Sequence, residues 1–233
     1  MITPTDIANT SMEVNGVKLS TKGVITGDIK VGAIQIDNSV YQGRNRTNFN
    51  VLATVQYMRS IDVTLFFSET TKRNLGLKKS EIDNMLNGKL ELKLPDGFYY
   101  SAYLEDAGEE QVLGVESTEV IALCHYKFKG IRHDALETVN SNSVTCKSKV
   151  PRTDCRLTVT ASQNYASLLI DTVTITDVTV GDVLVVDGIN GRILQNGALC
   201  AGNMSFIHFP YLVPGANTID CVETCKVEYY PTY

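Results

Sequence analysis

Apolar and polar residues alternate along much of the chain, and this pattern predicts short β-strands with one buried face. The segments 61–67 (IDVTLFF) and 90–94 (LELKL) place an apolar residue at every second position. Asn15-Gly16, between Val14 and Val17, has the sequence of a two-residue type I′ hairpin turn. Further strands are predicted at residues 24–31, 33–36, 98–104 and 119–129.

The sequence predicts one helix, over residues 80–87 (SEIDNMLN). Ser80 is suited to cap its start, Asp83 three residues later resembles a capping box, and Gly88 suits a left-handed end. Its apolar residues form one stripe: Ile82, Met85 and Leu86. Two turns are too short to be stable alone, so this helix is expected to pack on a sheet.

Three polar segments separate the predicted elements of this half. Residues 37–50 are predicted to form a loop, and residues 68–76 a short connection with room for one helical turn. Residues 105–110 (EDAGEE) are predicted to form an acidic turn that follows the strand 98–104.

A change in composition near residues 132–140 indicates a boundary between two domains, predicted as 1–135 and 136–233. The part after the boundary contains seven predicted strands, at 156–160, 167–171, 173–176, 183–186, 191–194, 204–209 and 222–230. Asp187-Gly188, Asn190-Gly191 and Asn196-Gly197 supply tight turns. Many short strands with regular turns are typical of a β-sandwich.

Composition supports a mainly β protein and argues against several functions. Val, Ile and Thr make up 63 of 233 residues, and branching at Cβ favours the pleated sheet. The net charge is −5, so the chain lacks the basic surplus of a sequence-specific nucleic-acid binder. No apolar run approaches the length that spans a membrane, and the first residues lack a secretory pattern, so synthesis in the cytoplasm is expected.

The residue patterns of enzymes are not found. There is no Gly-x-Ser-x-Gly motif and no glycine-rich phosphate loop between a strand and a helix. Of the histidines His125, His133 and His208, the first is adjacent to Cys124 in a predicted strand. Adjacent strand residues point to opposite faces, so Cys124 and His125 cannot pair as nucleophile and base. No catalytic residue is therefore assigned.

Ligand sites are also weakly indicated. Cys221 and Cys225, with Cys200 and His208, could complete a zinc site, but buried free thiols are the favoured interpretation and a disulfide stays open. The acids of residues 182–191 and 105–110 are interpreted as turns rather than as calcium or acid–base sites. Five tyrosines could contact sugars but are more typical of packing: Tyr165, Tyr211, Tyr229, Tyr230 and Tyr233. No metal and no cofactor is assigned.

Several segments resemble the distal tail protein (Dit) family of long-tailed phages and prophages of Gram-positive bacteria. They are residues 41–45 (YQGRN), 58–63 (MRSIDV), 96–102 (DGFYYSA), 185–187 with Asn196-Gly197, 209–219 (FPYLVPGANTI) and 225–230 (CKVEYY). Pro210 and Pro214 cannot donate to a β-ladder and Gly215 permits a tight turn, which suits a shaped crossover into the last strand.

The resemblance implies a mainly β fold of two β-sandwich domains. The first would be tail-tube-like with one short helix, and the second galectin-like or carbohydrate-module-like. It also implies a structural hub of a virion tail tip and no enzyme. Six copies would close into a ring that joins the tail-tube protein to the tail-tip protein and to peripheral receptor-binding proteins. The alternative hypothesis is an adhesin that binds cell-wall glycans through the C-terminal sandwich.

Overall fold

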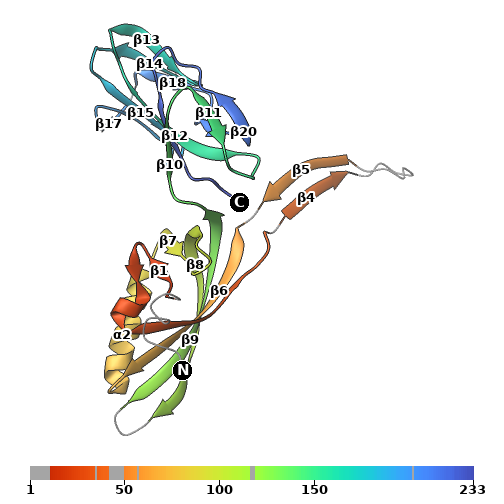
Figure 1. Cartoon of the computed structure of the whole chain (residues 1–233), viewed down its shortest axis with the longest axis vertical. Helices are drawn as coiled ribbons and strands as arrows, with labels where there is room; N and C mark the ends of the chain where they lie inside the picture. The colour runs from red at the N-terminus through yellow and green to blue at the C-terminus, as the bar shows by residue number, and fades with distance from the viewer. Residues whose placement is uncertain (1–10, 35, 42–49, 57, 116–118, 201) are drawn as a thin grey trace. The chain divides into compact units, whose positions relative to one another are not determined.

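A computed structural model describes residues 11–34, 36–41, 50–56, 58–115, 119–200 and 202–233. The chain divides into two compact units, unit 1 (Met1–Arg132) and unit 2 (His133–Tyr233). The boundary predicted from the sequence, between residues 135 and 136, lies three residues further along. Strands dominate both units (Figure 1), and the described residues contain one α-helix, so the mainly β class is confirmed.

Unit 1 is built on a seven-stranded sheet in the order β2-β1-β7-β8-β9-β6-β3. Its strands are β1 (Glu13–Val14), β2 (Val17–Lys18), β3 (Val24–Val31), β6 (Arg59–Glu69), β7 (Leu90–Lys93), β8 (Tyr99–Val115) and β9 (Val120–His133). A 3-10 helix, η1 (Leu19–Lys22), links β2 to β3. The N–H of Met12 donates to the Thr26 hydroxyl at 3.1 Å, which connects the two ends of this sheet around one core.

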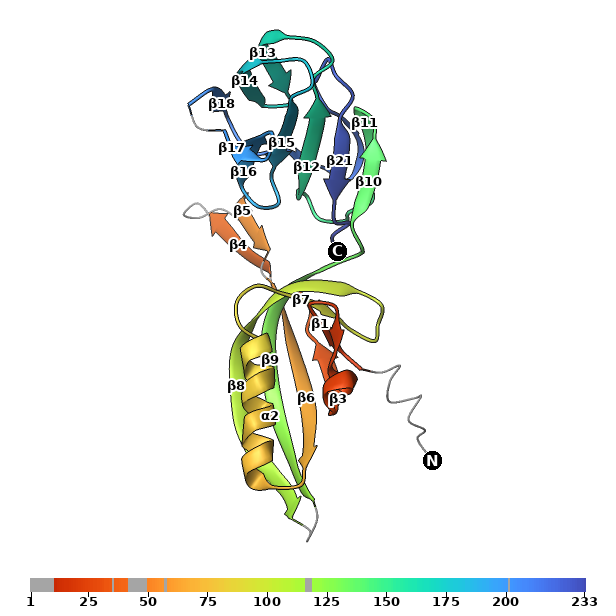
Figure 2. The same cartoon turned by 90° about the vertical axis from the view of Figure 1, so that its left-hand side faces the viewer.

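The inner face of the sheet carries the alternation seen in the sequence. Every second residue of β6 from Ile61 to Phe67 is buried, and so is every second residue of β9 from Val120 to Gly130. The helix α2 (Lys72–Met85) lies along β8 and β9 (Figure 2) and buries Leu75 and Ile82 in the same core. The predicted packing of the helix on the sheet is therefore confirmed.

The predicted start of the helix was wrong. The helix begins at Lys72, and its cap is Thr71, whose hydroxyl accepts the N–H of Asn74 at 3.2 Å. Ser80 lies inside the helix, where its hydroxyl donates to the carbonyl of Gly76. Leu75 is the only buried residue of the first two turns, so no apolar stripe marked them in the sequence.

Two predicted connections contain strands. The predicted turn at 105–110 lies within β8, and the predicted loop at 37–50 contributes most of β4 (Ile36–Tyr41) and the start of β5 (Asn50–Gln56). Residues 42–49 lie outside the described part. The predicted strand at 33–36 is not formed at 33 and 34. Two strands that the sequence did not predict follow β9: β10 (Glu137–Asn140) and β11 (Ser143–Cys146).

Unit 2 is a β-sandwich. One layer has the order β10-β21-β12-β15-β16-β17, with β19 also pairing β12. The sheet β13-β14-β18 and the pair β11-β20 form the rest of the sandwich (Figure 2). The remaining bounds are β12 (Thr153–Thr160), β13 (Tyr165–Ile170), β14 (Val173–Val178), β15 (Val183–Asp187), β16 (Arg192–Gln195), β17 (Ala198–Leu199), β18 (Met204–Phe206), β19 (Tyr211–Leu212), β20 (Gly215–Thr218) and β21 (Lys226–Tyr229). Leu157 and Val186 from the first layer and Ile170 and Ile175 from the second share one core.

The crossover predicted at residues 209–219 contains a turn that leads into β20. Gly215 has a φ of 92°, which favours glycine, and opens β20. The amide of Asn217 accepts the N–H of Val213 and donates to the carbonyls of Val213 and Gly215. One side chain therefore fixes the turn that brings the chain into β20.

Candidate functional surface

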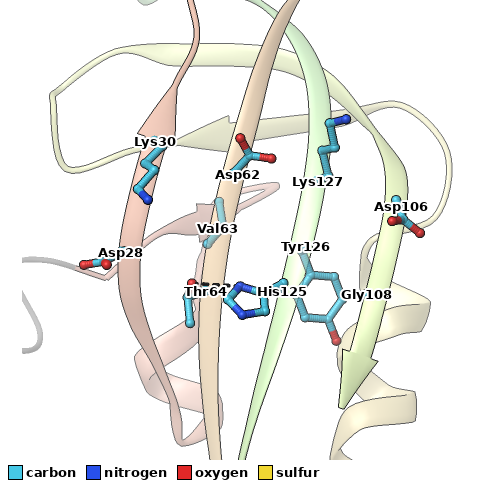
Figure 3. Close-up of a pocket in the computed structure, with 10 residues that line it drawn as sticks. All are labelled: Asp28, Lys30, Asp62, Val63, Thr64, Asp106, Gly108, His125, Tyr126 and Lys127. Atoms are coloured by element: carbon cyan, nitrogen blue, oxygen red, sulfur yellow. Dashed lines mark hydrogen bonds between the residues drawn. The ribbon is translucent and has the colours of Figure 1, made fainter. Parts of the chain in front are cut away.

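The outer face of the sheet of unit 1 carries a shallow pocket of about 420 Å³. Its polar lining comes from four neighbouring strands (Figure 3). The lining residues are Asp28, Lys30, Asp62, Val63, Thr64, Asp106, Gly108, His125, Tyr126 and Lys127. The pocket mixes three carboxylates with two lysines and a histidine, so no single charge sign dominates it.

A row of alternating charges crosses this face. The β-sheet register places Lys30 opposite Asp62, and Asp62 opposite Lys127. The carboxylate of Glu105 on β8 lies 3.3 Å from Lys127 Nζ and 2.8 Å from Lys129 Nζ. Hydrogen bonding from Lys129, and then from Lys127, holds the pKa of Glu105 below its usual range. Such exposed pairs contribute little to stability, but they give the face a specific charge pattern.

His125 lies beside this row and contacts a hydroxyl. Its Nδ1 is 3.2 Å from Thr64 Oγ1 on the neighbouring strand (Figure 3). Cys124 is buried on the opposite face, so the prediction that these two side chains point apart is confirmed. Next to them, Ile25 pairs with Phe66 and Phe66 with Leu123, which adds an apolar row to the same surface.

The other two histidines lie in unit 2 and serve its packing. His133 is buried, its Nδ1 is 2.8 Å from the carbonyl of Asp134, and its ring meets Tyr230 edge-on. His208 Nδ1 is 3.0 Å from the carbonyl of Phe209. The three histidines therefore occupy separate environments.

All six cysteines are free thiols, and five of them are buried. Burial raises the pKa of Cys124 and raises that of Cys155 to about 12. Within the described ranges, no group of three or more His, Cys, Asp or Glu side chains is arranged to hold a metal ion.

In the acidic segment 182–191, which contains strand β15, the carboxylates of Asp182 and Asp187 accept hydrogen bonds from neighbouring residues of unit 2. Asp182 accepts from the amides of Asn196 and Gln195 and from a backbone N–H, which together hold its pKa at about 2. Asp187 accepts the N–H and the amide of Asn190 and pairs with Arg156 and Arg192. Both carboxylates act as anchors of turns.

The five tyrosines considered for sugar contacts are engaged within unit 2. Hydroxyls donate from Tyr165 to Glu223, from Tyr229 to Glu137 and from Tyr233 to Asp134. Tyr230 packs on His133, and Tyr211 lies under the guanidinium of Arg152. These contacts position tyrosine rings against protein rather than free on a flat platform.

Comparison with solved structures identifies the fold. The chain superposes on the Dit protein of phage SPP1, described as a hub of the adsorption apparatus of Gram-positive-infecting phages. The TM-score is 0.73 at 10% identity, over 96% of this chain and 98% of that chain. The chain has the fold of a distal tail protein. The resemblance to distal tail proteins noted in the sequence is thus confirmed at the level of the fold.

A second solved structure with this fold is the baseplate of phage P2 in its activated conformation with Ca, with a TM-score of 0.50 at 9% identity. The alignment covers 89% of this chain and 91% of that chain. No family model and no curated protein sequence matches the chain. In the described residues no helix is long and apolar enough to cross a membrane. The galectin-like character of unit 2 stays a prediction.

The charged row on the outer face was not predicted from the sequence. Its members lie at positions 30, 62, 105 and 127, and only the register of four strands brings them together. One signal was present, because Lys127 and Lys129 alternate with buried residues along β9.

Proposed function

We propose that this protein is a structural hub of a phage or prophage tail tip and has no catalytic role. The observation that carries the proposal is the likeness to the Dit protein of phage SPP1 over nearly the whole of both chains. The carboxylates, tyrosines and histidines of unit 2 that were considered as site residues bond to or pack against other residues of the same unit. This supports a structural role.

Unit 1 forms the ring in this proposal, with six copies in head-to-tail contact. Among the described strands, β4 and β5 pair only with each other. A lone two-stranded ribbon is marginally stable in water, so contact with a neighbouring copy would stabilise it. The charged and apolar rows on the outer face of the sheet offer a second specific contact. A heterologous interface that closes on itself generates a ring.

The ring would join the tail-tube protein to the tail-tip protein, and unit 2 would attach peripheral receptor-binding proteins. The chain has a net charge of −5, which limits adhesion to DNA that passes through a ring. These partners come from the resemblance to distal tail proteins, and the proposal places the protein in the virion.

The experiment that tests the proposal is light scattering after gel filtration, with negative-stain images of the peak. We expect a mass of six times 25.6 kDa and rings with an open centre. A variant in which a short Gly/Ser linker replaces residues 37–55 should lose the ring and stay folded, because the seven-stranded sheet keeps all its pairings. The matched control is Val222→Lys, an exposed change in unit 2 that should leave the mass unchanged.

A chain that stays monomeric at every concentration, alone and with tail-tube and tail-tip proteins, would contradict the ring. Binding of that monomer to isolated Gram-positive cell wall would instead support the glycan-binding alternative. If rings still form without residues 37–55, the hub proposal stands, but the β4–β5 ribbon is not part of the interface between copies.

A further inference from the structure

Asn142 is one anchor of the segment between β20 and β21. Asn142 Nδ2 donates to the carbonyls of Cys221 and Glu223, both at 2.8 Å, and its Oδ1 accepts the N–H of Cys225 at 2.7 Å. Three hydrogen bonds made by one side chain hold the backbone at both cysteines and at Glu223 between them. The loop therefore presents Cys221 and Cys225 in a fixed relation.

A second anchor holds the middle of the same loop. One oxygen of Glu223 accepts the N–H of Ser162 at 2.8 Å and the hydroxyl of Tyr165 at 2.6 Å. The residue before it, Val222, is 79% exposed. The loop is thus rigid at its base and open to solvent at its tip.

The two thiols differ in access and in chemistry. Cys225 is fully buried, whereas Cys221 is partly exposed. The side chains of Cys221 and Cys225 interact, and this interaction lowers the pKa of Cys221 and raises that of Cys225. An accessible sulfur that carries thiolate character next to a buried thiol has the arrangement of an attacking and a resolving cysteine.

We propose that Cys221 and Cys225 form a thiol–disulfide exchange site that reacts with small dialkyl disulfides and closes into an internal disulfide. Cys221 Sγ attacks one sulfur of the small disulfide, whose S–S bond breaks and releases one thiolate. Cys225 Sγ then gives up its proton and attacks Cys221 Sγ, which releases the second thiolate. Two protein thiols are oxidised, one small disulfide is reduced to two thiols, and the two protons go to the released thiolates.

Asparagine acts as the positioning residue in this scheme. Asn142 holds the backbone of both cysteines, so its loss would let the sulfurs separate without changing either thiol. Asn142→Ala should therefore slow the closing step and leave the first attack by Cys221 in place.

The test uses the full folded chain with oxidised glutathione, followed by alkylation of the remaining thiols. Cleavage before each aspartate releases residues 220–233, which contain Cys221 and Cys225 and no other cysteine. We expect the wild-type peptide to emerge unalkylated with an internal disulfide, and to become alkylated after treatment with dithiothreitol. Cys221 should react about tenfold faster than the buried Cys200, because thiolate character and access set the rate.

Two variants separate the steps. Cys225→Ser should accumulate one glutathione adduct on Cys221, and Cys221→Ser should leave Cys225 unmodified until the chain is unfolded. Cys200→Ser is the matched control and should behave as the wild type. Free thiols at both positions in the oxidised wild type, or a stable glutathione adduct on Cys221 while Cys225 stays free, would overturn the proposal. The wild-type peptide gives this answer even if a variant fails to fold.

Discussion

Replacing Asp187 by asparagine removes one charge from the most connected carboxylate of unit 2 and leaves its size almost unchanged. Asp187 is fully buried at the end of β15. Its Oδ2 lies 3.2 Å from Arg156 Nη2 and 3.3 Å from Arg192 Nε, and accepts the Asn190 amide at 2.8 Å. In Asp187→Asn the amide NH₂ group replaces one carboxylate oxygen, so one of these donors faces another donor and loses its hydrogen bond.

The expected cost follows from these contacts. Hydrogen bonds to charged groups contribute about 1.5–3 kcal/mol each, and breaking a buried pair costs about 3–5 kcal/mol. The side chains of Arg156 and Arg192 are 30% and 50% exposed, so water compensates part of the loss. We therefore expect Asp187→Asn to lower the free energy of unfolding of unit 2 by about 3 kcal/mol. Asp154→Asn, in an exposed pair with Arg152, should cost about 1 kcal/mol or less.

The acid dependence gives a second readout. Burial alone would raise the pKa of Asp187, but hydrogen bonds from Asn190 and Arg156 outweigh it and hold the pKa below 3.8. A carboxyl group whose pKa is lower in the folded state stabilises that state at pH values above its unfolded-state pKa. This stabilisation is lost as the pH falls through the folded-state pKa. The difference between Asp187→Asn and the wild type should thus be largest above about pH 4 and shrink below it.

Urea denaturation followed by circular dichroism measures both quantities, since the chain has no tryptophan. Hydrogen exchange in peptides of β12 and β15 shows whether the loss is confined to unit 2. Equal midpoints for Asp187→Asn and Asp154→Asn would refute the inference that the buried carboxylate holds the turn. A difference that persists unchanged at pH 2 would refute the electrostatic cause.

Three further predictions concern single side chains. Hydrogen bonds from an asparagine amide and two other donors hold the pKa of Asp182 at about 2, so Asp182→Asn should flatten the loss of stability between pH 3.8 and 2, measured by urea midpoints. Tyr126→Phe removes a 2.8 Å bond to Asp83 and should cost about 1 kcal/mol, with faster hydrogen exchange in α2. Gly188→Ala places a Cβ 2.7 Å from a backbone carbonyl and should lower the melting temperature, whereas Gly76→Ala, in open space within α2, should raise it. Unchanged exchange in α2, or equal melting shifts for the two alanine variants, would contradict these assignments.

The sequence predicts those strands and helical turns that bury one regular apolar face. β6 was found because its inner residues from Ile61 to Phe67 are all buried and its outer residues are mostly polar. The first two turns of α2 were missed because they bury only Leu75. The strand β8 was cut short at 105–110 because its polar residues there pair across the sheet, as Glu105 does with Lys129.

The candidate surface depends on the register between neighbouring strands, which the sequence alone does not specify. Lys30 and Asp62 become neighbours through the register of β3 with β6, and a bulge between Thr26 and Ile29 shifts that register. A shift by one residue would turn every side chain of β3 to the other face. Periodicity could therefore predict that β3 has an outer face, but not which charges that face sets beside those of β6.

The two faces of this sheet are under different constraints, and this accounts for a shared fold at 10% identity with the SPP1 protein. The inner face needs only apolar side chains of suitable volume, which many sequences supply. The outer face has no such requirement for folding, so its charges can vary while the fold is kept. If the ring proposal holds, exchanging the charges of Asp62 and Lys127 should disturb assembly while the melting temperature stays close to that of the wild type, because exposed pairs contribute at most about 1 kcal/mol. Loss of folding in that double variant would show instead that the row supports the sheet itself.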